Sequence, residues 1–152
     1  MSVRKVSSFF LLFHGLSLII SGCIYAFSPT FTPWHSMAIG NNIVADGTQR
    51  VLFSLYRVVG WTVIVCGLSV ILLSHGMFIS SRKGLYFIEN NMILWLILSL
   101  LALTPTTSSL IVSFQVGWRF CPWYMPALGI LICLPSLYIL KPSKNEKKTK
   151  FK

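Results

Sequence analysis

Four long apolar runs constrain this chain more than any other feature of its sequence. They cover residues 9–27, 51–73, 92–114 and 123–140. A helix needs roughly 20 apolar residues to cross the hydrocarbon core of a bilayer, where only hydrogen bonds within the protein can satisfy its backbone. None of the runs contains an acidic residue, and their only permanent charge is Arg57. The sequence therefore predicts an all-α integral membrane protein, a bundle of four transmembrane helices.

The composition agrees with this interpretation. The chain has 152 residues, which is enough for one small domain. Charged residues make up 11% of it and apolar residues 55%, whereas a soluble domain carries about 25% charged residues. Most of the surface is therefore expected to face lipid.

The basic residues predict how the helices are oriented. The chain has 13 Lys and Arg residues against 3 Asp and Glu. If all four runs span, one side of the membrane holds Arg4, Lys5, Arg82, Lys83 and the six lysines of residues 141–152, and the other holds Arg50, Arg57 and Arg119. Basic residues favour the cytoplasmic side, so both termini are predicted to be cytoplasmic.

The last segment, residues 141–152, is rich in lysine and is expected to be a disordered cytoplasmic tail. A polybasic segment beside a membrane attracts anionic lipid headgroups, at about 1 kcal/mol per basic residue. We therefore expect lipid rather than nucleic acid as its partner.

Two alternatives concern the ends of spans. Ile20 to Cys23 resembles a lipobox, and cleavage before Cys23 would leave a lipidated protein with three spans. We favour a retained first helix because the apolar run continues to Phe27. The third span contains Pro105 beside several hydroxyl side chains, and it could instead start near Leu85 and stop near Thr104.

The segment between the first two spans has helix signals of its own. Thr32 suits an N-cap, Pro33 the first helical position and Gly40 a C-terminal stop. A short helix in the outer interface would place Trp34, Met37 and Ala38 on one face. Asp46-Gly47 is then predicted to form a turn into the second span.

Small residues recur every seven positions in the first two spans. They are Gly15 and Gly22 in the first, and Gly60, Gly67 and Ser74 in the second. In lipid, small residues let helix backbones approach closely. We expect these stripes to form contacts within the bundle, with a homo-oligomeric contact as the alternative.

Arg57, His35 and Arg119 are the candidate ligand-binding residues on the outer side. A charge within a span is expensive and is by default a functional hypothesis. Arg57 would then bind an anionic or carbonyl-bearing group, with His35 and Arg119 as neighbours. The alternatives are that Arg57 reaches outward to lipid phosphates, or that it forms a structural salt bridge with Asp46.

A second polar group is predicted near the inner face, where His14, His75 and Glu89 could meet and relay protons. A polar contact that ties helices together is the simpler interpretation. The histidines lack the spacing of a metal-ligand set, and no catalytic motif is found, so we predict no metal site and no catalytic residues. Of the four cysteines, Cys23 and Cys121 fall on the outer side and could form a disulfide.

Several short motifs resemble small bacterial four-helix membrane proteins of the DoxX-like type. They are Phe31 to His35, Gly40, the stretch Leu55 to Gly60 with Gly67, and Arg82-Lys83-Gly84. The resemblance covers most of residues 9–140. It implies a four-helix bundle in a bacterial inner membrane and membrane-associated redox or quinone partners.

The absence of a catalytic constellation leads us to expect a non-enzymatic protein. It would bind a lipid-like molecule or act as an accessory subunit, as a homo-oligomer or in a membrane complex, and no motif implies a cofactor. The alternatives are a DoxX-like quinone or redox subunit, and a small oligomeric transporter with a broken helix at Pro105.

Overall fold

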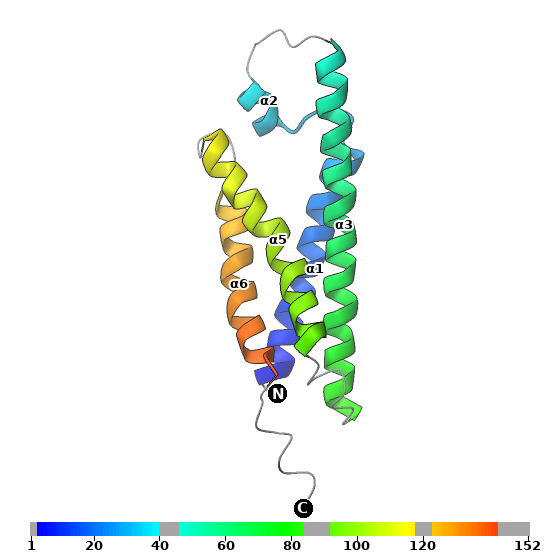
Figure 1. Cartoon of the computed structure of the whole chain (residues 1–152), viewed down its shortest axis with the longest axis vertical. Coiled ribbons are helices and arrows are strands. Elements are labelled where there is room, and N and C mark those ends of the chain that lie inside the picture. The colour runs from blue at the N-terminus through cyan, green and yellow to red at the C-terminus, as the bar shows by residue number, and fades with distance from the viewer. Residues whose placement is uncertain (1–2, 40–45, 84–91, 118–122, 143–152) are drawn as a thin grey trace, which may run out of the picture.

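The chain folds into helices. The computed structural model describes residues 3–39, 46–83, 92–117 and 123–142, and within these residues there is no strand. Figure 1 shows the five helices of the described chain, which are α1 (Val3–Phe27), α2 (Pro33–Ile39), α3 (Asp46–Lys83), α5 (Met92–Val116) and α6 (Tyr124–Leu140). The predicted all-α class is confirmed.

Three of these helices are long and apolar enough to cross a membrane. The qualifying segments are Lys5–Phe27 in α1, Gly47–Gly76 in α3 and Met92–Gln115 in α5. Helix α6 is also apolar but has 17 residues, or about 26 Å at 1.5 Å per residue. That length lies at the lower limit for a hydrocarbon core of about 30 Å. The chain thus has three helices fit for a multi-pass membrane protein, and a shorter fourth.

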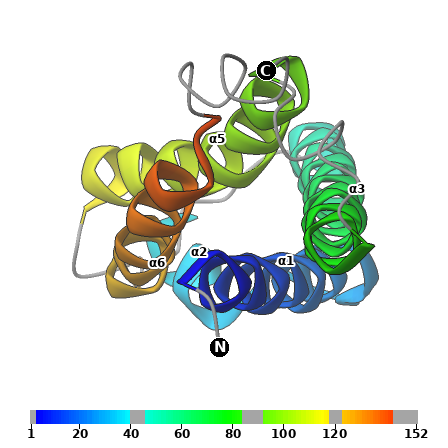
Figure 2. The same cartoon turned by 90° about the horizontal axis from the view of Figure 1, so that it is seen from below.

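Helices α1, α3, α5 and α6, here called the four long helices, form a ring. Helix α1 packs against α3 and α6, and α5 packs against α6 and α3, as the axial view in Figure 2 shows. Figure 1 places the start of α1 and the end of α6 at one end of the bundle, here called the termini end. The short helix α2 lies at the opposite end, here called the α2 end, where α5 and α6 diverge from α1 and α3.

The apolar core lies where all four long helices contribute side chains. Its buried members are Leu11, Val70, Leu98, Ala102, Cys133, Leu137 and Leu140. Trp95 of α5 packs against this core, and its Nε1–H donates a 2.9 Å hydrogen bond to the Leu137 carbonyl of α6. This hydrogen bond joins α5 to α6.

The predicted small-residue stripes meet within the bundle. A Cβ atom added to Gly67 would lie 2.7 Å from the Gly15 carbonyl oxygen, and one added to Gly15 would lie 2.9 Å from the Gly67 carbonyl oxygen. Helices α1 and α3 are therefore in backbone contact at these positions. Ser74 continues the small-residue series of α3 and is fully buried, and its hydroxyl has no partner among the described residues.

Several helix ends differ from the prediction. Helix α1 begins at Val3 rather than near Phe9, and α3 extends beyond residues 51–73 at both ends. The predicted turn at Asp46-Gly47 is wrong, because these residues begin α3. The helix that continues from these residues overrides the local Asp-Gly turn signal.

Helix α5 passes through Pro105 without a break and ends at Val116. The alternative end near Thr104 is therefore wrong, whereas Leu85 lies outside the described residues. The hydroxyl of Thr106 donates to the carbonyl oxygens of Ala102 and Leu103, and that of Thr107 donates to Leu103 at 2.8 Å. Pro105 has no N–H for the carbonyl of Leu101, four positions before it, and the two accepting carbonyls directly follow that position.

Candidate functional site

Five rings from four segments gather at the α2 end. We call them the outer aromatic cluster, and they are Tyr25 of α1, Phe31 of the α1–α2 connection, His35 of α2, and Phe53 and Tyr56 of α3. Tyr56 is central and buried, with its ring centroid 4.7 Å from Tyr25 and 5.4 Å from His35. The cluster holds the segment around α2 against α1 and α3.

The predicted short helix exists, and Thr32 fixes its start. The Thr32 carbonyl accepts hydrogen bonds from the backbone N–H groups of His35 and Ser36, both at 3.0 Å. Its backbone N–H donates to the Tyr56 hydroxyl of α3 at 3.3 Å, and its side-chain oxygen lies 2.5 Å from Nδ1 of His35. Of the predicted interfacial face, Met37 is exposed; the side chains of Trp34 and Ala38, and Gly40, lie outside the described residues.

His35 is half-buried among these rings. Tyr25 and Tyr56 face it from α1 and α3, with centroids at 5.5 and 5.4 Å. Burial lowers the pKa of His35 from its ordinary value of 6.5, because the surroundings disfavour the charged imidazolium. The neutral ring is therefore the form that the docked α2 helix favours.

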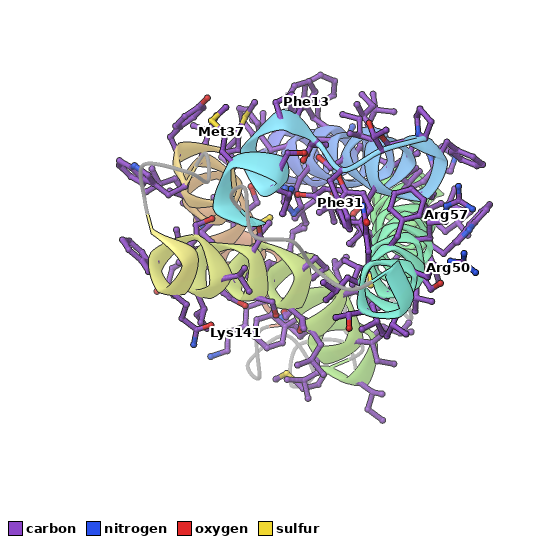
Figure 3. The ribbon with its side chains drawn as sticks, turned by 90° about the horizontal axis from the view of Figure 1, so that it is seen from above. Phe13, Phe31, Met37, Arg50, Arg57 and Lys141 are labelled. Atoms are coloured by element: carbon purple, nitrogen blue, oxygen red, sulfur yellow. The ribbon has the colours of Figure 1, made fainter. Side chains whose placement is uncertain are left out.

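Arg57 lies on the outward face of α3. Its side chain is exposed and projects away from the bundle, as does that of Arg50 (Figure 3). The guanidinium carbon lies 4.8 Å from the centroid of the Phe53 ring. A cation over an aromatic face is stabilised by the ring's quadrupole, so this contact orients the guanidinium.

The ring contacts also give the depth of Arg57 along the bundle. The preceding residue, Tyr56, contacts Tyr25, and Trp61, one turn further on, contacts Phe27 at 5.2 Å. Arg57 is therefore level with the last turn of α1, which ends at Phe27. The apolar segment of α1 ends at Phe27, whereas that of α3 runs from Gly47 to Gly76. Arg57 therefore lies near the end of the apolar zone that α1 and α3 share, rather than at its centre.

The alternative salt bridge from Arg57 to Asp46 is wrong. Both residues belong to the continuous helix α3 and are 11 positions apart. At 1.5 Å per residue they are about 16 Å apart along the axis, which is beyond the reach of an ion pair.

The three candidate ligand residues therefore do not form one pocket in the described chain. His35 lies among the rings of the outer aromatic cluster, Arg57 points outward, and Arg119 lies outside the described residues. Phe53 connects the first two, because it contacts Arg57 on one side and stacks near Tyr56 on the other. The prediction did not include Phe53, Tyr56 or Phe31, although the aromatic residues around Arg57 were a usable signal.

His14 occupies the junction of three helices, α1, α5 and α6. Its side chain is 2% exposed, and Nε2 lies 3.2 Å from the Ala102 carbonyl oxygen of α5. A carbonyl oxygen only accepts, so Nε2 carries the hydrogen and donates it. On α6, a Cβ atom added to Gly129 would lie 3.2 Å from Cε1 of His14. His14 thus ties α1 to α5 at a point where α6 comes close.

The other members of the predicted inner group are placed differently. His75 is exposed on α3. Gly15 of α1 lies level with Gly67 of α3, so His14 and His75 are separated by about 10 Å along the bundle axis. Glu89 lies outside the described residues. The structure therefore gives His14 the role of a contact between helices and does not bring His75 to it.

The described residues contain no group of three His, Cys, Asp or Glu side chains that could hold a metal ion. Cys23, Cys66 and Cys133 are free thiols, and Cys121 lies outside the described residues.

Comparison with known proteins finds no match among family models, curated proteins or solved structures. The resemblance to DoxX-like proteins stays a prediction.

Proposed function

We propose that this chain is a four-span membrane protein with both termini in the cytoplasm, and that it acts by binding a lipid-like molecule or a partner subunit within the bilayer. The observation that carries the proposal is the apolar outer surface of all four long helices. Exposed residues on it include Phe9 and Phe13 of α1, Leu72 of α3, Leu100 of α5 and Leu131 of α6. Such a surface is stable in lipid and not in water.

The inclusion of α6 as a span rests on its packing. It lies between α1 and α5 in the ring, and its outward residues Leu128, Leu131 and Leu134 are exposed. Seventeen residues are at the short end of what crosses a bilayer, and a locally thinner bilayer accommodates the mismatch at a modest cost.

The proposed orientation rests on charge. The lysine-rich tail follows α6 at the termini end, where α1 also begins. Lys and Arg favour the cytoplasmic side, so the α2 end with Arg50 and Arg57 faces outward. A retained first helix is part of this proposal, since Gly22 and Ala26, on either side of Cys23, both contact Gly60 of α3.

A binding role follows from the chemistry that the chain offers. Carboxylates are acids and bases in many hydrolytic sites, and the whole sequence has 3 of them, which argues against carboxylate-based hydrolysis. The transporter alternative needed a broken helix at Pro105, and α5 is continuous there.

Cysteine accessibility tests the topology. Thr48→Cys places a thiol at the start of α3, at the α2 end, and Lys141→Cys places one just after α6; both native residues are exposed. In intact cells a membrane-impermeant maleimide should label Thr48→Cys, whereas Lys141→Cys should react only after permeabilisation. The protein without either substitution is the control for labelling of the native cysteines. Labelling of both variants, or of Lys141→Cys alone, in intact cells would overturn the orientation.

A second candidate function is a quinone-associated redox subunit, as the DoxX-like resemblance implies. The observation that favours it is His35, a half-buried imidazole beside two tyrosines at the proposed outer leaflet. A quinone carbonyl would accept a hydrogen bond from such a group. Binding of a soluble quinone analogue that quenches intrinsic fluorescence, and that is lost in His35→Phe, would favour this function; equal quenching of both proteins would count against it.

A further inference from the structure

One outward stripe of α3 begins at Arg57 and continues with exposed apolar residues. Trp61, Val65, Leu68 and Leu72 follow at intervals of four, four, three and four positions, which keeps them on one helix face. All four side chains are exposed, Leu72 at 71%. We call these four residues the α3 stripe. They form an apolar surface directly below one guanidinium group.

The length of the α3 stripe matches one leaflet. From Trp61 to Leu72 the helix rises about 16 Å, and half of a hydrocarbon core of about 30 Å is about 15 Å. Arg57 lies one turn above Trp61, level with the end of α1, where the apolar segment of that helix also ends. Its guanidinium is thus at headgroup depth while the α3 stripe covers acyl-chain depth.

Arg50 lies on the same face as Arg57, seven positions and about 10 Å further outward. Figure 3 shows both side chains projecting from α3 in the same direction, away from the other helices. Two cations therefore face the headgroup region together, and the ring of Phe53 orients one of them.

We propose that an anionic phospholipid of the outer leaflet docks on this face of α3. The phosphate binds the Arg57 guanidinium, the rest of the headgroup lies toward Arg50, and an acyl chain lies along the α3 stripe. A guanidinium suits a phosphate because its parallel N–H groups donate two hydrogen bonds at once. This proposal rests on the membrane insertion and orientation proposed above.

Charge complementarity selects this occupant. A zwitterionic headgroup would bring its own cation toward Arg50, whereas an anionic headgroup has none to repel. A second copy of the chain related by a two-fold axis would bring the same face, with Arg50 and Arg57, against itself. Like charges then oppose each other, which disfavours a dimer through this surface.

Native mass spectrometry of nanodiscs with equal amounts of phosphatidylglycerol and phosphatidylcholine tests the proposal. The measured quantity is the ratio of the two lipids that stay bound to the released protein. The wild type should retain phosphatidylglycerol preferentially. Arg57→Ala should reduce that preference about fivefold, the factor for one basic residue at a lipid surface, and Arg57→Lys should reduce it less because the charge remains.

Lys141→Ala is the matched control. It removes one positive charge at the opposite end of the bundle, also from a contact over an aromatic ring, since Lys141 Nζ lies 6.0 Å from the Trp95 centroid. Arg57→Ala keeps the lysine tail, so lipid held by the tail contributes equally to this variant and to the wild type. A larger loss of the lipid preference in Arg57→Ala than in Lys141→Ala is therefore due to the Arg57 site. Lys141 is one of six lysines in a segment that is itself expected to attract anionic lipid, so Lys141→Ala should lower the preference, but by less than Arg57→Ala because five lysines remain there.

An absent preference in the wild type, or equal losses in Arg57→Ala and Lys141→Ala, would overturn the docking proposal. So would a dimer that forms in place of the lipid adduct and disappears in Arg57→Ala. These results would leave the membrane topology standing, because the cysteine-labelling experiment decides it separately. A protein that does not insert into nanodiscs would instead overturn the proposed function itself.

Discussion

Gly22 of α1 and Gly60 of α3 bring the backbones of their helices into direct contact. A Cβ atom added to Gly22 would lie 2.7 Å from the Gly60 carbonyl oxygen, and one added to Gly60 would collide with the backbone of Ala26. In lipid, packing apolar side chains between helices brings no hydrophobic stabilisation, because the lipid tails are equally apolar. Close van der Waals packing at small residues is therefore what holds helices together. This pair and the pair of Gly15 with Gly67 set the register between α1 and α3.

Gly60→Ala should destabilise the bundle by about 1 to 3 kcal/mol, the range for overpacking a close-packed interface. The added methyl group has no space and forces α1 and α3 apart. Reversible unfolding in mixed detergent micelles measures the change. Gly76→Ala is the control on the same helix, because its Cβ atom would meet no atom of the described residues within 4 Å; it should be neutral or stabilising by up to about 1 kcal/mol. Equal effects of the two variants would refute close packing at Gly60.

His14→Phe should weaken the attachment of α1 to α5 by about 0.6 to 1.7 kcal/mol, which are the average and the maximum found for hydrogen bonds between membrane helices. Phenylalanine keeps a ring at this position but cannot donate to the Ala102 carbonyl. The same unfolding assay measures the loss. Phe13→Leu is the control, because Phe13 is adjacent in sequence but exposed on the outward face (Figure 3). A His14→Phe protein as stable as the wild type would mean that the bond contributes nothing.

Trp95→Phe should cost a similar amount, about 0.6 to 1.7 kcal/mol, by removing the hydrogen bond from Nε1 to the Leu137 carbonyl. The loss should affect the α5–α6 contact near the termini end. Hydrogen exchange of the α6 amides, compared with that of α3 amides in the same sample, localises it. Faster exchange confined to α3 would contradict the predicted site of action.

Acid should weaken the docking of α2. Burial lowers the pKa of His35 below 6.5 in the docked form, so below pH 6.5 the undocked form binds a proton that the docked form does not. The contribution of neutral His35 to the free energy of α2 docking is therefore fully present above the ordinary pKa of 6.5. It falls as the pH drops through 6.5 toward the lowered pKa. Hydrogen exchange of residues 33–39, corrected for intrinsic rates, should be faster at about pH 5.5 than at about pH 7.5.

His35→Phe is the control for this pH dependence. It keeps a ring between Tyr25 and Tyr56 and removes the only imidazole that α2 contains. Exchange in residues 33–39 should then lose its dependence on pH. A dependence that persists in His35→Phe would assign it to another group.

The sequence by itself determined the helical class, the positions of the apolar helices and the short helix after Thr32. These features follow from local properties, namely the length of an apolar run, a capping residue and the spacing of small residues. The glycine stripes also predicted a contact, since two stripes of matching period can pack along their length. Helix ends were less well predicted, because Asp46-Gly47 reads as a turn locally but lies in the first turn of α3.

Only the tertiary structure decided how the polar residues are placed. The sequence left Arg57 between a ligand site, a salt bridge and an interfacial anchor. The continuous helix excludes Asp46, and the contacts of Tyr56 and Trp61 with α1 put Arg57 at the end of the apolar zone, facing outward. His14 and His75 were grouped by side of the membrane, but depth and direction depend on helix register and rotation. Helix register and rotation are set by packing between helices distant in sequence, such as Gly22 against Gly60. A local sequence pattern therefore cannot predict them.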